Sequence, residues 1–370
     1  MNPLVSFVVP CYKLAHLLPQ CVNSILAQTY GNFEVLIMDN CSPDNTPEVA
    51  ASFDDPRVTH IRNDVNLGHV RNFNKGISMA RGKYVWLVSA DDWLRGTAVL
   101  GRYVELMERN PEVGYVFCRA VEVQGSQEIG AASWTNCGKK ERIWNGRGFL
   151  KRLIQGNCIV MSSAMVRKKC YETVGTFSLE MPHANDWYLW CVLALHNQVA
   201  YFPEPMVFVR IHEESLTTAF NKKSNSVCVV DELSVLWRVA RLAELTGAFS
   251  HRHPFNACIA NRAARALKSG PAESTGPGLT EPDFEALLRR HVRDSKDEAD
   301  IRARVFMAVG DEHFWRGEYR KATQAYWLGI RLRPLWLRSW TKYLLLRTGG
   351  VGVRIRRFLL DLRRQSVEAK

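Results

Sequence analysis

Short apolar runs alternate with segments of helical spacing along the first third of the chain. Residues 5–9, 33–38 and 58–61 are runs rich in branched and aromatic side chains, which predicts strands. Between the first two, residues 15–28 place their Leu, Val and Ile side chains three and four apart, as in a helix packed on a sheet. Strands that alternate with helices in units of about 30 residues predict an α/β fold with a largely parallel sheet.

A further strand, residues 84–88, is apolar on both faces and is followed by two adjacent acids, Asp91 and Asp92. Such a run is typical of a central strand in a sheet that helices cover on both sides. Ligands of open α/β sheets bind beyond the carboxyl ends of the strands. Carboxylates there can hold a divalent cation that in turn binds phosphate. The alternative is that both acids cap the next helix, where negative charge is favoured.

The pattern changes after this region. Residues 119–145 are polar and rich in glycine, which indicates a long hairpin or a flexible loop. Residues 158–166, 199–202 and 206–210 are strand-like, and a helix is expected to begin at Asn185 and Asp186.

Beyond residue 224 the periodicity is helical. We therefore predict two domains, an α/β domain over residues 1–223 and a helical region over residues 224–370. Residues 317–326, followed by Pro334, resemble one tetratricopeptide-like helix pair, and an ordinary helical hairpin fits the same residues.

Composition indicates the class of protein and its cellular compartment. A hydrophobic fraction of 46% is ordinary for a globular chain. The sequence begins without a basic segment before an apolar run, and no stretch approaches the roughly 18 apolar residues of a membrane-spanning helix. The ten cysteines form no Cys-x-x-Cys pair or zinc-like cluster. We expect a reduced, cytoplasmic protein.

The net charge of +12 is concentrated at the end of the chain. Residues 331–370 carry 11 Lys and Arg against 2 Asp and Glu, a net charge of +9. Residues 335–364 combine these cations with aromatic and aliphatic side chains at helical spacing, which suits an anionic membrane surface. We expect peripheral contact with the inner face of a membrane; a C-terminal helix packed on the body is the alternative. The chain has no recognisable nucleic-acid-binding module, so we expect no nucleic acid partner.

The sequence lacks the motifs that would support hydride transfer from a dinucleotide or P-loop phosphoryl transfer. The loop after the first strand, residues 10–13, lacks the Gly-x-Gly-x-x-Gly of a dinucleotide fold, and the chain has no Gly-x-x-x-x-Gly-Lys-Ser/Thr. The remaining candidates for chemistry follow the strands in order: Tyr12, Asp39, Arg71, Asp91, Asp92, Asp186 and His212.

The order and spacing of these residues resemble the family 2 glycosyltransferases of the GT-A fold. The resemblance covers roughly residues 4–218 and rests on seven motifs: residues 5–12, 34–44, 66–72, 80–92, 174–177, 185–187 and 210–215. It implies a mixed, mostly parallel sheet flanked by helices, followed here by the helical C-terminal region that the resemblance does not cover.

The resemblance also implies roles for individual residues. Pro10, Tyr12 and Asp39 would line the nucleotide pocket, with Asp39 accepting a hydrogen bond from the uracil imide, an interaction that suits a carboxylate. Arg71 would lie near the base or the phosphates; a surface charge on a helix is its alternative. Thymine has the same imide edge, so UDP-sugars are favoured and dTDP-sugars stay open.

Asp91 and Asp92 would bind the Mn²⁺ or Mg²⁺ that bridges the diphosphate, and we favour Asp92 for the metal, with Asp91 shared between metal and ribose. The family often has Asp-x-Asp-Asp here, whereas this chain has Ser89 at the first position. His212 would be a metal or diphosphate ligand, with a structural histidine as the alternative.

Asp186 would be the general base that activates an acceptor hydroxyl, so that a single displacement inverts the anomeric carbon. The family usually has Glu-Asp at this point, and this chain has Asn185 before the base. A helix cap is the alternative for Asp186.

Together these features predict an inverting, metal-dependent glycosyltransferase. It would move a sugar from a nucleotide-sugar donor to a glycan or lipid-linked glycan, in cell-surface polysaccharide or glycan assembly. A sugar nucleotidyltransferase is less well supported, because it should carry a glycine-rich phosphate loop after the first strand. A catalytically inactive scaffold of the same fold is kept open by Ser89 and Asn185.

Overall fold

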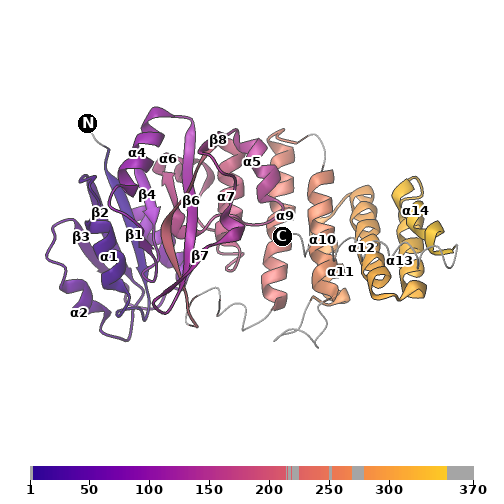
Figure 1. Cartoon of the computed structure of the whole chain (residues 1–370), viewed down its shortest axis with the longest axis horizontal. Coiled ribbons are helices and arrows are strands. Elements are labelled where there is room, and N and C mark those ends of the chain that lie inside the picture. Colours follow the sequence, from indigo (N-terminus) through magenta and orange to yellow (C-terminus); the bar gives the residue numbers. More distant parts are fainter. Residues whose placement is uncertain are drawn as a thin grey trace. The chain divides into compact units, whose positions relative to one another are not determined.

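The computed structural model describes residues 3–213, 215, 218, 225–249, 252–268 and 279–347 (Figure 1). It divides the chain into two compact units, Met1–Ala219 with Leu245–Ala248 and Phe220–Glu244 with Phe249–Lys370. The predicted domain boundary after residue 223 stays a prediction, and each unit is treated separately below.

The first unit is built on one ten-stranded sheet with the order β3-β2-β1-β4-β9-β6-β10-β5. Its first half is parallel and consists of β1 (Val5–Cys11), β2 (Phe33–Asp39), β3 (Val58–Arg62) and β4 (Tyr84–Leu87). Figure 1 shows these strands side by side at the N-terminal end of the chain. The predicted α/β class, a mixed sheet with a large parallel part, is confirmed.

The second half of the sheet is mixed. The strand β9 (Ala164–Arg167) runs antiparallel between β4 and β6 (Val113–Gln124), and β6 pairs in parallel with β10 (Gln198–Ile211). Three short strands pair antiparallel at the periphery: β5 (Trp93–Leu94), β7 (Gln127–Ala131) and β8 (Arg142–Trp144).

Helices cover both faces of the sheet because the central strands are apolar on both faces. On β1, Phe7 and Val9 belong to the core that includes α1 (Leu18–Leu26) and α4 (Val99–Arg109). Val8 points the other way, toward Gly76 of the helix α3. The other helices of this unit are α2 (Thr46–Ala51), α3 (His69–Met79), α5 (Gly146–Leu153), α6 (Lys168–Val174) and α7 (Asn185–His196).

Three predicted segments differ in detail. Of residues 119–145, only 119–131 form the hairpin that was one of the two predicted alternatives, because β6 extends to Gln124 and pairs with β7. Of residues 158–166, only 164–166 lie in a strand, and residues 161–163 form a short 3₁₀ helix. The strands predicted at 199–202 and 206–210 are one strand, β10, because pairing with β6 resumes after an irregularity at Pro205.

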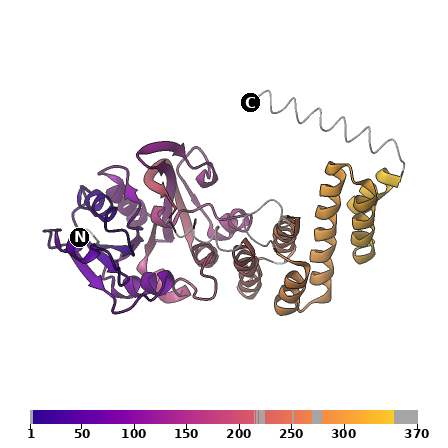
Figure 2. The same cartoon turned by 90° about the horizontal axis from the view of Figure 1, so that it is seen from below.

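The second unit is helical, as predicted. A left-handed Gly317 ends α12 and allows the chain to turn into α13. The two helices lie beside each other (Figures 1 and 2), with Gly310 packed against the ring of Tyr326. The described helices are α9 (Asn225–Leu245), α10 (His253–Lys268), α11 (Glu281–His291), α12 (Ser295–Arg316), α13 (Tyr319–Leu332) and α14 (Leu337–Arg347).

The start of the basic C-terminal segment packs partly into this unit. Trp336 and Tyr343 contact the core formed by Met307, Phe314 and Tyr326, whereas Leu335 is almost fully exposed. Residues 348–364 of the predicted membrane-binding segment lie outside the described residues, so the membrane contact stays a prediction. In the part of the chain that the structure describes, no helix is long and apolar enough to span a bilayer.

Gly82, in the turn before β4, is a sensitive position. A Cβ atom there would lie 2.7 Å from the backbone nitrogen of Ser6 and 2.8 Å from the carbonyl oxygen of Leu4. We expect Gly82→Ala to lower the free energy of unfolding by about 2 kcal/mol or more, because the backbone of a central strand cannot move aside. Urea denaturation measures this change.

Gly31→Ala is the matched control, because no atom lies within 4 Å of the added Cβ. We expect a change within about 0.5 kcal/mol. Equal stability of the two variants would contradict the close packing at Gly82.

Candidate functional site

The candidate site lies at the carboxyl ends of β1, β2 and β4. Cys11 is opposite Asp39 in the register of β1 and β2, and the Ala90 amide donates to the Pro10 carbonyl, 3.3 Å. The loops that follow β1 and β2 both contain a non-glycine residue with positive φ, Lys13 (61°) and Cys41 (58°). Such backbone conformations are uncommon and often occur at functional sites. Pro10 is buried in β1, and the Tyr12 side chain after it is exposed.

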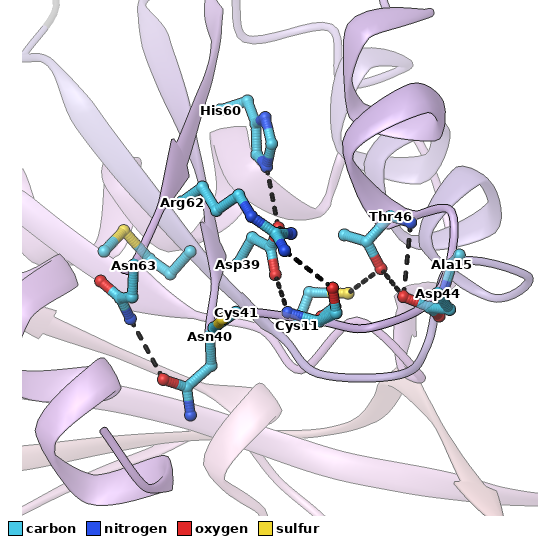
Figure 3. Close-up of polar contacts among 12 residues, drawn as sticks. Cys11, Ala15, Asp39, Asn40, Cys41, Asp44, Thr46, His60, Arg62 and Asn63 are labelled. Atoms are coloured by element: carbon cyan, nitrogen blue, oxygen red, sulfur yellow. Dashed lines mark hydrogen bonds and ion pairs between the residues drawn. The ribbon is translucent and has the colours of Figure 1, made fainter. Parts of the chain in front are cut away.

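Asp39 is a buried carboxylate held by an ion pair and hydrogen bonds (Figure 3). Its side chain has no exposed surface and accepts hydrogen bonds from Arg62 Nη1, 2.6 Å, and from the Ser42 amide, 2.8 Å. The Nε2 atom of His60 lies 3.3 Å from the same carboxylate. Arg62 and His60 come from β3, and no motif in the sequence marked them, because their role depends on the register of β2 and β3.

Asp44 joins the loops that follow β1 and β2. Its carboxylate accepts from the Ala15 amide, 3.1 Å, and from the amide and hydroxyl of Thr46, 3.3 and 2.6 Å (Figure 3). Burial alone would raise the pKa of Asp44, but these hydrogen bonds outweigh it and lower the pKa below its ordinary value. The predicted nucleotide-binding loops are therefore joined by one carboxylate.

A network of asparagine side chains connects β2 to the start of α3. Asn63 Nδ2 donates to Asn40 and to Asn72, and Asn72 Nδ2 donates to the Met38 carbonyl, 2.8 Å. The neighbouring Arg71 is exposed on α3, and among the described residues none accepts a hydrogen bond from it. The network places the Arg71 backbone beside the end of β2 and leaves its side chain directed to solvent.

Both carboxylate oxygens of Asp92 are engaged by the protein. Ser162 Oγ donates to Oδ2, 2.5 Å, and the Arg210 amide donates to Oδ1, 3.1 Å. Burial, and next the charge of Asp91, hold the pKa of Asp92 well above its ordinary value. Ser162 also accepts from the Ser89 amide, 3.1 Å, so this buried hydroxyl binds both ends of the short segment between β4 and β5 that carries the two acids.

Asp91 is the more accessible acid of the pair. Its Oδ2 lies 2.9 Å from His212 Nε2, and both side chains are partly exposed. Among the described residues, no three His, Cys, Asp or Glu side chains gather as a metal site. A Mg²⁺-type site can consist of one or two protein ligands completed by substrate phosphates and water, so the donors of Asp91 and His212 fit such an ion.

Asp186 lies at the start of α7. Its Oδ1 accepts from the Trp187 amide, 2.7 Å, and its Oδ2 accepts from Asn157 Nδ2, 2.8 Å. Burial raises the pKa of Asp186, and the two hydrogen bonds oppose this effect. The Asn185 side chain does not hydrogen-bond to Asp186. Its Nδ2 donates to the Pro182 carbonyl, 2.7 Å, and the same carbonyl oxygen lies within hydrogen-bond distance of His69 Nε2 of α3.

The structure brings Asp91, Asp92 and His212 together and places Asp39 at the end of β2, which β1 separates from β4. Asp186 contacts none of these residues directly in the described part of the chain. Three further residues complete the arrangement, Arg62, Asn157 and Ser162. The sequence offered no signal for them, since each acts through a contact between segments distant in the chain.

The chain is similar to known glycosyltransferases in sequence and in fold. The model of glycosyl transferase family 2 matches residues 6–175. Glycosyltransferase GlyG of Streptococcus pneumoniae is 35% identical over 115 residues, which are 30% of this chain and 38% of that protein. Succinoglycan biosynthesis protein ExoO of Rhizobium meliloti is 40% identical over 93 residues, which are 25% of this chain and 27% of that protein. The matches thus span less than half of both relatives.

Among solved structures, residues 1–349 of TarS from Staphylococcus aureus in complex with UDP-GlcNAc align with a TM-score of 0.56. The alignment covers 95% of this chain and 91% of that one, at 16% sequence identity. At this identity the likeness concerns the fold.

Asp44→Ala tests the connection between the loops. We expect a loss of about 1–2 kcal/mol in the free energy of unfolding at pH 7, since the backbone amides of Ala15 and Thr46 lose their acceptor. Because folding lowers the pKa of Asp44, its contribution is present above the ordinary Asp range and disappears as the pH falls through the folded-state value. The difference from wild type should therefore narrow in acid, as measured by denaturation at several pH values.

Asp64→Ala is the control, because Asp64 is exposed in the loop after β3 and no described residue binds its carboxylate. A loss as large as that of Asp44→Ala would show that the effect is not specific to the connection.

Proposed function

This chain carries a glycosyl transferase family 2 domain at residues 6–175, and on that premise we propose that it is a metal-dependent, inverting glycosyltransferase. It takes a sugar from a nucleotide-sugar donor, with UDP-sugars favoured and dTDP-sugars as the second class. The observation that carries the proposal is the position of Asp39 at the end of β2 and of Asp91 and Asp92 shortly after β4, two parallel strands on either side of β1, at the edge where open α/β sheets bind nucleotides.

The nucleotide contacts are proposed for the loops that follow β1 and β2. Pro10 and Tyr12 line the base, and Asp39 accepts from the imide of uracil or thymine. The Asp39 carboxylate has lone pairs that neither Arg62 nor the Ser42 amide uses. A further donor can therefore bind to it once the Arg62 side chain moves aside and opens access. TarS, a fold neighbour, is described as a complex with UDP-GlcNAc, which supports UDP as the first choice. Arg71, exposed beside these loops, supplies a cation for the phosphates.

The diphosphate end of the donor is proposed to lie at the acid pair. We assign the ligation of Mn²⁺ or Mg²⁺ to Asp91 and His212 rather than to Asp92, which the sequence favoured, because Asp92 is buried whereas Asp91 and His212 are partly exposed and lie 2.9 Å apart. Such an ion, when bound, neutralises the negative charge on the leaving nucleoside diphosphate. Asp92 then keeps Asp91 in place through the Arg210 amide and Ser162.

Asp186 is proposed as the general base. Burial raises the pKa of Asp186, and a higher pKa makes the carboxylate a better proton acceptor. Asp186 takes the proton of an acceptor hydroxyl as that oxygen attacks the anomeric carbon from the face opposite the diphosphate. One such displacement inverts the configuration at this carbon.

The acceptor is proposed to be a growing glycan, free or linked to a lipid. The name of the relative ExoO, a succinoglycan biosynthesis protein, supports polysaccharide assembly as the setting. A lipid-linked acceptor would agree with the predicted membrane contact of residues 335–364, of which residues 335–347 are described.

Transfer is tested by incubating the full chain with a panel of UDP- and dTDP-sugars and Mn²⁺, and by measuring release of the nucleoside diphosphate. We expect turnover with one donor, and Asp186→Asn should lower kcat for transfer by a factor of roughly 10²–10⁴ while leaving the donor KM near that of wild type. NMR of the product should show an inverted anomeric carbon.

Wild-type transfer rates in Asp186→Asn would contradict the role of the base. No turnover with any donor, in protein that binds none of them by calorimetry, would favour the inactive scaffold.

The different roles proposed for Asp91, a metal ligand, and for Asp92, which keeps Asp91 in place, can be tested separately. We expect Asp91→Asn to weaken Mn²⁺-dependent binding of the donor about tenfold or more, with a melting temperature near that of wild type. Asp92→Ala should instead lower the free energy of unfolding by about 2 kcal/mol, because the buried Ser162 hydroxyl and Arg210 amide lose their partner. Calorimetry and thermal denaturation measure the two effects; the opposite pattern would assign the metal to Asp92.

A further inference from the structure

Residues 157–163, between α5 and β9, contact both acid centres of the site. At one end, Asn157 Nδ2 donates to Asp186 Oδ2 over 2.8 Å. At the other end, Ser162 Oγ donates to Asp92 Oδ2 over 2.5 Å. These residues are the one described segment that hydrogen-bonds to side chains of both centres.

The segment is held firmly enough to position what it contacts. Trp86 Nε1 donates to the Ser162 carbonyl, 2.9 Å, and the Tyr103 hydroxyl donates to the Ser163 carbonyl, 3.0 Å. Ser162 and Ser163 are almost completely buried. Asn157 itself is fixed, because its Oδ1 accepts from the Ile159 amide, 3.1 Å, which directs its Nδ2 to Asp186.

This arrangement gives Asn157 a defined effect on the base. The Trp187 amide and Asn157 each occupy one oxygen of Asp186, so the carboxylate cannot rotate without losing one of the two hydrogen bonds. An N–H donor stabilises the ionised carboxylate, which is the form that accepts a proton. Burial acts in the opposite direction, and the neighbouring His183 also favours the ionised form.

Resting on the proposed function, we propose that Asn157 is a positioning residue of the transfer reaction, which holds the carboxylate of Asp186 in one orientation by donating to its Oδ2. It acts through Asp186 and contacts neither donor nor metal. Ser162 secures the other end of the segment, so that the base and the acid pair keep a constant separation.

The test compares Asn157→Asp with Asn157→Ala by the pH dependence of kcat/KM. Asn157→Asp keeps the shape of the side chain and the oxygen that accepts from the Ile159 amide, but it replaces the donor by a second carboxylate. We expect the acidic limb of the profile to move to higher pH in both variants, by about one pH unit in Asn157→Ala and further in Asn157→Asp.

A purely structural role predicts the reverse order. The turn at Ile159 would tolerate Asn157→Asp and would be damaged by Asn157→Ala, and activity would fall equally at every pH. That result would overturn the proposal. Asn157→Gln, which keeps an amide donor, should return the acidic limb toward the wild-type pH.

Two controls test whether the shift of the acidic limb arises from Asp186. Gln155→Ala changes an exposed residue of the preceding turn and should leave the profile unchanged. The charged and titratable groups that face Asp186 are His183 and the buried Cys191, whose thiol stays protonated because burial raises its pKa. Repeating the comparison in a His183→Gln background removes the imidazole, and the shift should persist.

A second readout separates this proposal from the proposed function. In protein labelled with ¹³C-aspartate, the carboxyl resonance of Asp186, identified by its loss in Asp186→Asn, should titrate at higher pH in Asn157→Ala than in wild type. A shifted resonance with an unshifted acidic limb would overturn the positioning role while leaving transfer intact. A shifted resonance in a protein that transfers no sugar would refute the proposed function and, with it, the role of Asn157 in transfer.

Discussion

The site depends on the shared register of three parallel strands. Residues of β1 pair with those of β2 and β4 without a register shift, so the three strands end at the same edge of the sheet. Tyr12, Asp39 and Asp91 lie at or just beyond these strand ends. In a sheet packed on both faces, a slip of one residue would place every side chain of a strand on the wrong face. The interdigitated core of Phe7, Trp86 and Tyr103, whose rings stack at 5.5 and 4.3 Å, opposes such a slip.

Burial gives two adjacent acids different properties. Asp92 points into the protein, where Ser162 and the Arg210 amide bind it, and the cost of its charge appears as a raised pKa. Asp91 points out and meets His212 at the end of β10. Neighbouring carboxylates that repel each other are best separated in this way, one neutralised or satisfied inside and one free to bind a cation. At position 89 it is the backbone amide that binds the hydroxyl holding Asp92, a contact that does not depend on the side chain there.

Much of the fold followed from local pattern, and the exceptions have a common cause. The strands at 5–9, 33–38 and 58–61 and the helix at Asn185 were correct because their apolar spacing is strong. The β6–β7 hairpin was not clear from its own polar, glycine-rich sequence, since it is stabilised by pairing with β10, a strand far along the chain. Residues 158–163 are apolar enough for a strand, but the hydrogen bonds of Ser162 and Ser163 to Trp86 and Tyr103 hold them in another conformation.

The sequence by itself determined the α/β class, the helical C-terminal region and the identity of the acids at the strand ends, because apolar periodicity and residue type are local properties. Only the tertiary structure decided how those acids are used. It paired Asp39 with Arg62, left Asp91 facing His212, engaged both oxygens of Asp92 and placed Asn157 against Asp186. Each of these contacts joins residues at least 20 positions apart, so strand register and burial control them, and neither can be read from a short stretch of sequence.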